Sequence, residues 1–347
     1  MQYFVRVSVS VFVVGVFYLA VTAQNAPTPA TGEKKLPVIE EKKHKNYVQK
    51  IPNSRVSFEM VAIPGGEYMM GSPENEDGRK PHEGPQHHVK VQPFWMGKME
   101  VRWDEYDQYW RKLPGAKKPV TPMEKAADAV TRPTPPYADE TFGHGREGNP
   151  VLCISYHSAS KYCEWLSALT GKYYRLPTEA EWEWACRAGT TTAYSYGNDA
   201  DKLGEYAWYI DNSDDLAHPV GKKKPNPWGL YDMHGNVSEW CLDQYQKDFY
   251  RTFKPNKISL NPVLLPDHKR YSHVTRGGSW LDEAEDCRSA SRVGSTKDWL
   301  RRDPQRPQSI WWMTDADYVG FRVVCAVNEQ KHLQNIKSKI TRKSPDS

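Results

Sequence analysis

The sequence predicts a single α+β domain with little regular secondary structure, spanning residues 55–328. Two observations favour this class. The 347 residues include 13 Trp and 20 Tyr beside 26 Pro and 23 Gly, so large aromatic side chains must fill the core and many turns must connect short elements. Helical and strand patterns are correspondingly brief, and no internal repeat divides this stretch.

Strands are predicted at the start of the domain. Apolar and polar residues alternate over 58–64, and Gly65-Gly66 then turns the chain. A polar loop over 73–86 leads to further strand patterns over 87–91 and 94–96.

Three helices are predicted in the middle of the chain. Residues 101–112 place aromatic side chains at helical spacing. Ser155 can cap a second helix that ends at Gly171, and Thr178 with Glu181 forms a capping box at the start of a third. The intervening segment 113–149 and the stretch 193–327 are expected to be loops and short strands.

The first 23 residues have the pattern of a secretory signal peptide. Arg6 precedes an apolar run over 7–20, and Val21-Thr22-Ala23 provides a cleavage site after Ala23. A membrane anchor is the alternative, but the run is shorter than the ~20 residues that cross a bilayer. We therefore expect a secreted or periplasmic protein with no membrane span after signal removal.

Polar segments flank the predicted domain. Residues 24–54 are rich in Pro, Lys and Glu and predict a disordered linker, and residues 329–347 predict a polar, frayed tail. The formal net charge is only +4, the balance of 47 basic and 43 acidic residues, so composition gives no support to nucleic-acid binding.

Several motifs resemble the sulfatase-modifying-factor family, best known from the formylglycine-generating enzyme. The matching segments are MVAIPGGEYMMGS, HHVKVQPFWMGKMEVRWDEYDQYW, RLPTEAEWEWACRAG, NPWGLYDMHGNVSEW, RGGSW and DADYVGFRVV. They occur in the family's order. The resemblance implies a formylglycine-generating-enzyme-type domain, related to C-type lectin folds.

The family's reaction oxidises a cysteine of a sulfatase with oxygen and copper, held by two cysteines that follow the RGGSW motif. Here Asp282 stands at the first of these positions, and a carboxylate is a poor ligand for copper(I). Ser279, a family active-site serine, is retained. The resemblance thus makes Ser279 and Asp282 catalytic candidates, with copper-dependent oxidation not supported.

The resemblance also implies structural disulfides. In some relatives the cysteines matching Cys163 and Cys186 pair with partners two residues away from Cys325 and Cys287. A shift of two residues along a strand keeps a side chain on the same face of the sheet. The expected pairs are Cys163–Cys325 and Cys186–Cys287. Cys153 and Cys241 are left as a third bridge or as buried thiols.

A calcium site is implied by the segment GLYDMHGNVSEW. The residues that match calcium-binding positions of the family are Asp232, Gly235, Val237 and Glu239. Carboxylates and backbone carbonyls are the hard oxygen donors that calcium prefers. The alternative is a turn in which Asp232 and Glu239 cap backbone amides.

A binding groove is expected beside Ser279. Its candidate residues combine arginine and tryptophan, the usual anchors of recognition surfaces: Arg276, Trp280, Trp311, Trp312 and Arg322. Two functions remain open. The protein binds or modifies a protein or peptide, such as an exported sulfatase or complex, or it is a non-catalytic lectin-like module or accessory subunit. A genuine sulfatase-maturation oxidase is a third alternative, which needs Cys287 free and a second thiol.

Overall fold

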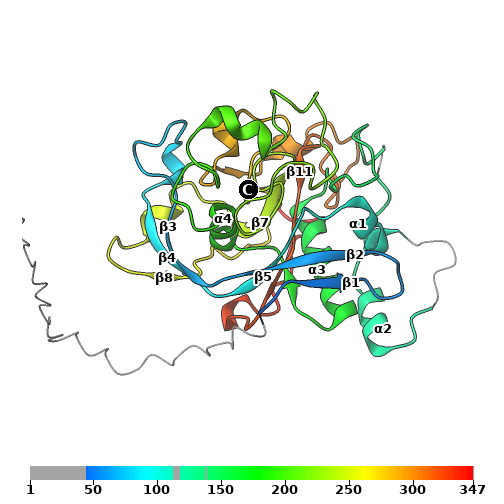
Figure 1. Cartoon of the computed structure of the whole chain (residues 1–347). Helices are drawn as coiled ribbons and strands as arrows, with labels where there is room; N and C mark the ends of the chain where they lie inside the picture. The colour runs from blue at the N-terminus through cyan, green and yellow to red at the C-terminus, as the bar shows by residue number, and fades with distance from the viewer. Residues whose placement is uncertain (1–43, 112–117, 137–138, 347) are drawn as a thin grey trace, which may run out of the picture. The chain divides into compact units, whose positions relative to one another are not determined.

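The computed structural model describes residues 44–111, 118–136 and 139–346 (Figure 1). The predicted signal peptide and most of the predicted linker lie outside these ranges. The described residues form three small sheets and four α-helices joined by long irregular segments. This confirms the α+β class. No helix in the described ranges is long and apolar enough to cross a bilayer.

A five-stranded antiparallel sheet joins both ends of the domain. Its strands in spatial order are β1 (Tyr47–Lys50), β2 (Ser57–Ile63), β5 (Phe94–Gly97), β12 (Val324–Ala326) and β6 (Tyr174–Arg175). Every neighbouring pair is antiparallel. The last strand of the domain is therefore inserted between strands from its first half.

Two smaller sheets complete the strand framework. One contains, in order, β10 (Arg292–Gly294), β9 (His273–Arg276), β7 (Ser238–Gln244) and β11 (Val319–Gly320). The other contains β3 (Gly66–Met70), β4 (His87–Val91) and β8 (Ser259–Leu260). Each of these sheets has one parallel pair, β11 with β7 and β8 with β4.

The three predicted helices are present as α1 (Trp103–Trp110), α3 (Tyr156–Thr170) and α4 (Glu179–Arg187). The predicted caps are confirmed, because the Ser155 hydroxyl accepts the Ser158 N–H at 3.1 Å and Thr178 forms a capping box with Glu181. Gly171 ends α3 with φ 71°.

A fourth helix, α2 (Pro122–Asp128), lies in the stretch expected to be a loop, and Thr121 and Glu124 cap it. Short 3-10 helices occur at Pro81–Glu83 (η2), Ala200–Glu205 (η3), Phe249–Thr252 (η4), Ala284–Cys287 (η5), Lys297–Leu300 (η6) and Lys331–Leu333 (η7).

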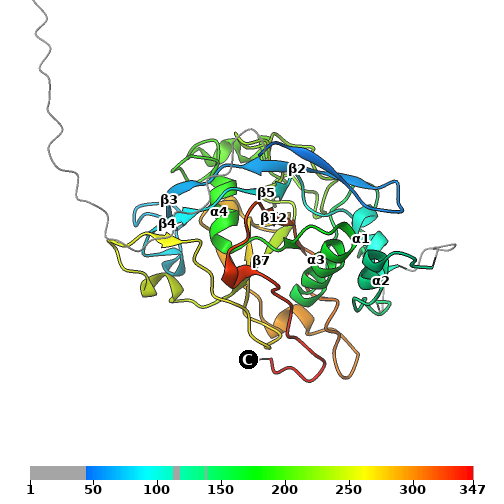
Figure 2. The ribbon, with the colours of Figure 1, turned by 90° about the horizontal axis from the view of Figure 1, so that it is seen from below.

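Helix α4 lies in the interior of the domain. All nine of its residues are buried, and it packs against β3 and β4 of one sheet and β7 and β9 of another (Figure 2). Helices α1 and α2 pack on α3, where aromatic side chains such as Tyr106, Tyr109 and Tyr162 fill the second part of the core. The core therefore consists largely of aromatic rings, as the composition predicts.

The polar flanks are more ordered than predicted. The linker prediction over 24–54 fails at its end, because residues 47–50 form β1 and pair with β2. The prediction of a frayed tail over 329–347 also fails. Leu333 and Ile340 are buried, and the Tyr173 hydroxyl donates to the Leu333 carbonyl at 2.8 Å. Isolated apolar residues in these polar segments supply the burial that orders them.

Replacement of Leu333 tests this docking. We expect Leu333→Ala to lower the free energy of unfolding by about 2–4 kcal/mol, since it leaves a cavity under the C-terminal segment. Urea denaturation of the full chain measures the change. Lys339→Ala, at an exposed position of the same segment, is the control and should have no effect. Equal stability of Leu333→Ala and Lys339→Ala would contradict the docking.

Candidate functional site

The candidate site is the loop that follows β9 and carries Ser279 and Asp282. Two glycines with positive φ, Gly277 and Gly278, turn the chain out of the strand. A Cβ on Gly278 would lie 2.7 Å from the Cys287 Sγ, so the loop passes closely over that thiol. The Trp280 N–H donates to the Asn236 carbonyl at 2.8 Å, which ties the loop to the turn before β7.

Ser279 and Asp282 form a hydrogen-bonded pair. The Ser279 hydroxyl donates to Asp282 Oδ2 at 2.6 Å, and Ser279 itself is fully buried. Burial raises the pKa of Asp282. The hydrogen bond from Ser279 lowers this pKa in part, and the negative charge of nearby Asp286 raises it further. The structure thus brings the two predicted residues together, with the serine directed at the carboxylate.

Cys287 lies beneath this loop and is fully buried. Burial raises the pKa of its thiol well above the usual range. Its carbonyl accepts the His234 Nδ1–H at 2.7 Å, which fixes the tautomer of that histidine. The sulfur is therefore a protonated thiol in the interior, against the Gly278 backbone.

The surface around the loop combines apolar and acidic side chains. The Ile210 N–H donates to the Asp282 carbonyl at 3.1 Å, so two loops lie side by side. Three aliphatic residues on these loops are 39–45% exposed: Ile210, Leu216 and Leu281. Exposed carboxylates interleave with them, namely Asp211, Asp214, Asp215, Glu283 and Glu285. We call this the Leu281 surface. Sequence reasoning missed its aliphatic members, because loop residues have no periodic signal.

The residues predicted to bind calcium meet at the turn before β7. Gly235 has φ 75°, and a Cβ there would lie 2.1 Å from the Trp208 carbonyl oxygen, so only glycine fits. Asp232 is buried; one carboxyl oxygen accepts a backbone N–H, and Oδ1 has no hydrogen-bond partner among the described residues. Both oxygens of Glu239 bind Arg322, at 2.5 and 2.6 Å. The guanidinium thus takes the place expected for calcium at Glu239.

Buried carboxyl groups gather at this turn. Glu100, which sequence reasoning missed, accepts the Val237 N–H at 3.1 Å and lies near Asp232 and Glu239. Burial raises the pKa of Asp232 to about 6 and that of Glu100 well above the usual range. Three carboxylates face one guanidinium, that of Arg322. Within the described residues, however, no three acidic, histidine or cysteine side chains are arranged to hold a metal ion.

The predicted disulfide Cys186–Cys287 is not formed. All six cysteines are free and buried. The Cys186 Sγ lies 3.5 Å from the Ser289 Oγ, so Ser289 occupies the position opposite Cys186. The prediction assumed that Cys287 lies on a strand, where an offset of two residues keeps the same face. Residues 284–287 form η5 instead, and this turns Cys287 toward Gly278.

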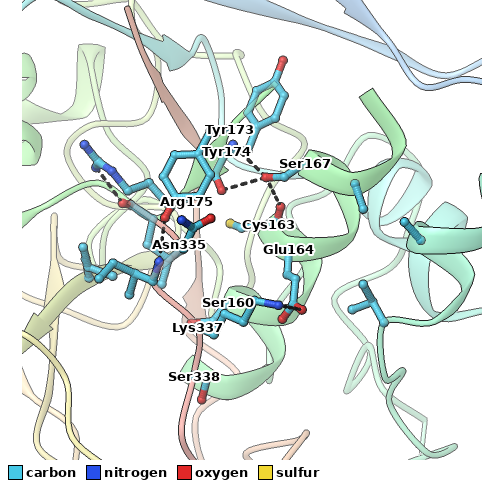
Figure 3. Close-up of a pocket in the computed structure, with 16 residues that line it drawn as sticks. Ser160, Cys163, Glu164, Ser167, Tyr173, Tyr174, Arg175, Asn335, Lys337 and Ser338 are labelled. Carbon is cyan, nitrogen blue, oxygen red and sulfur yellow. Dashed lines mark hydrogen bonds and ion pairs between the residues drawn. The ribbon is translucent and has the colours of Figure 1, made fainter. Parts of the chain in front are cut away.

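The predicted disulfide Cys163–Cys325 is also absent. Cys163 lines a cavity of about 270 Å³. Figure 3 shows Cys163 on α3 among the lining residues, which include Asn335, Lys337 and Ser338. Cys325 lies on β12 between Trp95 and Tyr174, and its Sγ is 3.9 Å from the Ala326 carbonyl oxygen. The two sulfurs therefore have different surroundings.

The five residues predicted to line a groove lie in the interior instead. Each is at most 7% exposed: Arg276, Trp280, Trp311, Trp312 and Arg322. The Arg276 guanidinium binds Glu183 at 2.5 Å, and the Trp312 indole N–H donates to the Thr134 carbonyl at 2.8 Å. The Arg276 guanidinium and the Trp312 indole thus bind partners inside the domain, although Arg276 Nε has no hydrogen-bond partner among the described residues. These five residues therefore do not form an exposed groove.

Comparison with known proteins shows that this arrangement of strands belongs to a known family. A family model of the sulfatase-modifying factor enzyme 1-like domain matches residues 47–327. The chain is a member of this family. The match begins at the first residue of β1 and ends just after β12, so it covers the whole strand framework. The described residues thus have the formylglycine-generating-enzyme type of fold.

Relatives of this domain differ in function. The formylglycine-generating enzyme of Thermomonospora curvata is 30% identical over 280 residues, which cover 69% of this chain and 89% of that enzyme. The serine/threonine-protein kinase pkn1 of Chlamydia pneumoniae is 33% identical over 248 residues, 67% of this chain. The chain spans only 35% of the length of that kinase.

Solved structures share the fold. PvdO from Pseudomonas aeruginosa superposes with a TM-score of 0.59 at 28% identity, over 81% of this chain and 98% of PvdO. Treponema denticola variable protein 1 superposes with a TM-score of 0.57 at 23% identity, over 81% of this chain and 99% of that protein, which shows the fold alone.

The raised pKa of Asp282 predicts a pH-dependent effect of Asp282→Asn. The folded protein binds the carboxyl proton more tightly than the unfolded chain, so the ionised carboxylate costs stability once the pH rises above its ordinary pKa of 3.8. We expect Asp282→Asn to be more stable than wild type at neutral pH.

Thermal melting as a function of pH measures this effect. The difference between Asp282→Asn and wild type should vanish below pH 3.8, where the aspartate is protonated in both states. Glu283→Gln, at the exposed neighbouring position, is the control and should show no difference. A destabilised Asp282→Asn at neutral pH would contradict the prediction.

Proposed function

We propose that this protein is an exported member of the sulfatase-modifying-factor family that binds a protein or peptide segment at the Leu281 surface. The signal-peptide pattern of residues 1–23 supports export. The observation that carries the binding proposal is the exposure of Ile210, Leu216 and Leu281 together on two adjoining loops. Large aliphatic side chains gathered in this way are typical of interaction sites.

The residues near Ser279 do not fit a copper(I) centre. Copper(I) prefers soft thiolate ligands, and here Asp282 supplies a hard carboxylate where the family places its first cysteine. The second candidate ligand, Cys287, is a buried thiol with a raised pKa. These features support a function other than copper-dependent cysteine oxidation, and they disfavour a genuine sulfatase-maturation oxidase.

A non-catalytic role is the second candidate, as a binding module or accessory subunit of an exported complex. Ser279 is fully buried, and its hydroxyl donates to Asp282. A nucleophile needs an exposed oxygen and a neighbouring base that is free to accept its proton. The closed Ser279–Asp282 pair supports a structural role for the loop that bears Leu281.

The chemistry of the Leu281 surface specifies its ligand. Five exposed carboxylates lie on the same two segments as the three aliphatic side chains, and none of the five is in an ion pair within the described ranges. Opposite charges steer association and favour the correct partner. An extended segment that alternates basic and aliphatic residues is the ligand that fits this surface.

Fluorescence anisotropy with two labelled peptides of equal length tests the proposal, one alternating Lys and Leu and the other Glu and Leu. We expect only the basic peptide to bind, with an affinity that falls as salt is added. Leu281→Ser should weaken its binding about tenfold, because one buried aliphatic contact is lost.

Leu265→Ser is the matched control, since Leu265 is similarly exposed at 42% on another loop. Equal binding of the two peptides, or equal effects of Leu265→Ser and Leu281→Ser, would contradict the proposal.

A sulfatase-motif peptide incubated with copper(I), oxygen and the protein should keep its mass. Conversion of its cysteine to formylglycine would overturn the proposal against oxidase activity.

A structural calcium ion near Asp232 forms part of the proposal. The Asp232 Oδ1, which is buried and has no hydrogen-bond partner among the described residues, supports a cation there. Asp232 and the carbonyl oxygens of Gly235 and Val237 would hold it, and Glu100 would add negative charge. Glu239 remains the partner of Arg322.

Removal of calcium tests this assignment. We expect a chelator to lower the melting temperature of the wild-type protein, because an ion that binds only the folded state stabilises it. Asp232→Asn should melt at the same temperature with and without chelator. Asp211→Asn, an exposed aspartate outside the turn, should respond like wild type. A wild-type melting temperature that chelation leaves unchanged would remove calcium from the proposal.

A further inference from the structure

An open cavity of about 730 Å³ lies next to the C-terminal end of α4. Its wall is formed by residues 189–192, the turn 195–197, Tyr206 and residues 225–227. None of the residues that line it carries a charge, although 26% of the chain is charged. The lining consists of hydroxyl and amide side chains, glycine and proline. A neutral polar ligand suits such a cavity better than an ion.

Stacked tyrosine rings form one wall. Tyr196 stacks on Tyr206 with 4.2 Å between ring centroids and 13° between planes, and Tyr194 stacks behind Tyr196 at 5.3 Å and 8°. Tyr196 and Tyr206 are half-buried and line the cavity. Stacking fixes the orientation of the rings, so the wall is a rigid aromatic platform that offers both apolar area and hydroxyl groups.

Two threonine hydroxyls at the cavity already donate their protons within the protein. Thr190 Oγ1 donates to the Arg187 carbonyl at 2.9 Å, and Thr192 Oγ1 donates to the Tyr194 carbonyl at 2.6 Å. Each threonine oxygen keeps lone pairs that can accept hydrogen bonds.

Ser195 lies against His234. His234 donates its Nδ1 proton to a carbonyl, so its Nε2 is an acceptor, and the backbone N–H and the hydroxyl of Ser195 both approach it, at 3.2 and 3.0 Å. The oxygens of Thr190 and Thr192 therefore act as acceptors, whereas the hydroxyls of Thr191 and Tyr206 have no partner among the described residues and can both donate and accept.

We infer that this cavity binds a neutral, polyhydroxylated ligand, an oligosaccharide segment. Sugar rings carry hydroxyl groups that can pair with Thr190, Thr191 and Thr192, and apolar C–H faces that pack on aromatic rings such as Tyr206. The cavity has room for more than one sugar unit, since ligand pockets commonly measure about 300–1,000 Å³. This site is distinct from the Leu281 surface and does not depend on the proposed peptide binding.

Saturation-transfer NMR with four neutral trisaccharides tests the inference: maltotriose, mannotriose, galactotriose and chitotriose. We expect at least one to bind and to contact tyrosine protons. Tyr206→Ala should weaken that binding about tenfold. Thr191→Asp, which places a charge at an exposed position of the wall, should weaken it similarly without loss of the fold.

Tyr231→Ala is the matched control. Like Tyr206, Tyr231 is half-buried and has a lysine near its ring, Lys98 at 5.7 Å against Lys224 at 5.8 Å for Tyr206. Tyr231→Ala and Leu281→Ser should bind the trisaccharide as wild type does. The inference is overturned if none of the four trisaccharides binds, or if Thr191→Asp and Tyr206→Ala bind as tightly as wild type.

Discussion

The buried ion pairs of helix α4 are the constraint on which the rest of the structure depends. The helix has glutamates at alternate positions and is buried on every side, so each carboxylate needs a cation inside the domain. Four arginines meet this need: Arg187 of the helix itself, Arg175 just before it, and Arg276 and Arg292 from distant strands. The pairs are Arg292–Glu179 at 2.6 Å, Arg175–Glu181 at 2.6 Å, Arg276–Glu183 at 2.5 Å and Arg187–Glu183 at 2.8 Å.

These pairs fix the positions of the strands around α4. Arg175 belongs to β6, Arg276 to β9 and Arg292 to β10, so one short helix sets the register of two sheets. Loss of one partner would leave a charge buried without compensation, which is strongly destabilising. Arg276 is also the residue before Gly277, where the Ser279 loop begins. The position of the Leu281 surface therefore depends on the Arg276–Glu183 pair in the interior.

Local chemistry in the sequence was sufficient to predict the helices, but it was not sufficient to predict the long-range contacts. The caps at Ser155 and Thr178 depend only on neighbouring residues, and both were predictable. The burial of Arg276 and Arg322 depends on carboxylates far along the chain, so these side chains were expected in a groove. The pairing of Cys287 failed for a similar reason, because it assumed a strand where η5 turns the backbone.

The five-stranded sheet has a consequence for how the chain folds. Strand β12, at residues 324–326, pairs with β5, at residues 94–97, and with β6, at residues 174–175, so the sheet cannot close before nearly the whole chain is available. Such high contact order slows folding and leaves strand edges unpaired during synthesis. The nascent polypeptide must therefore leave the facing edges of β5 and β6 unpaired until its last strand has been synthesised.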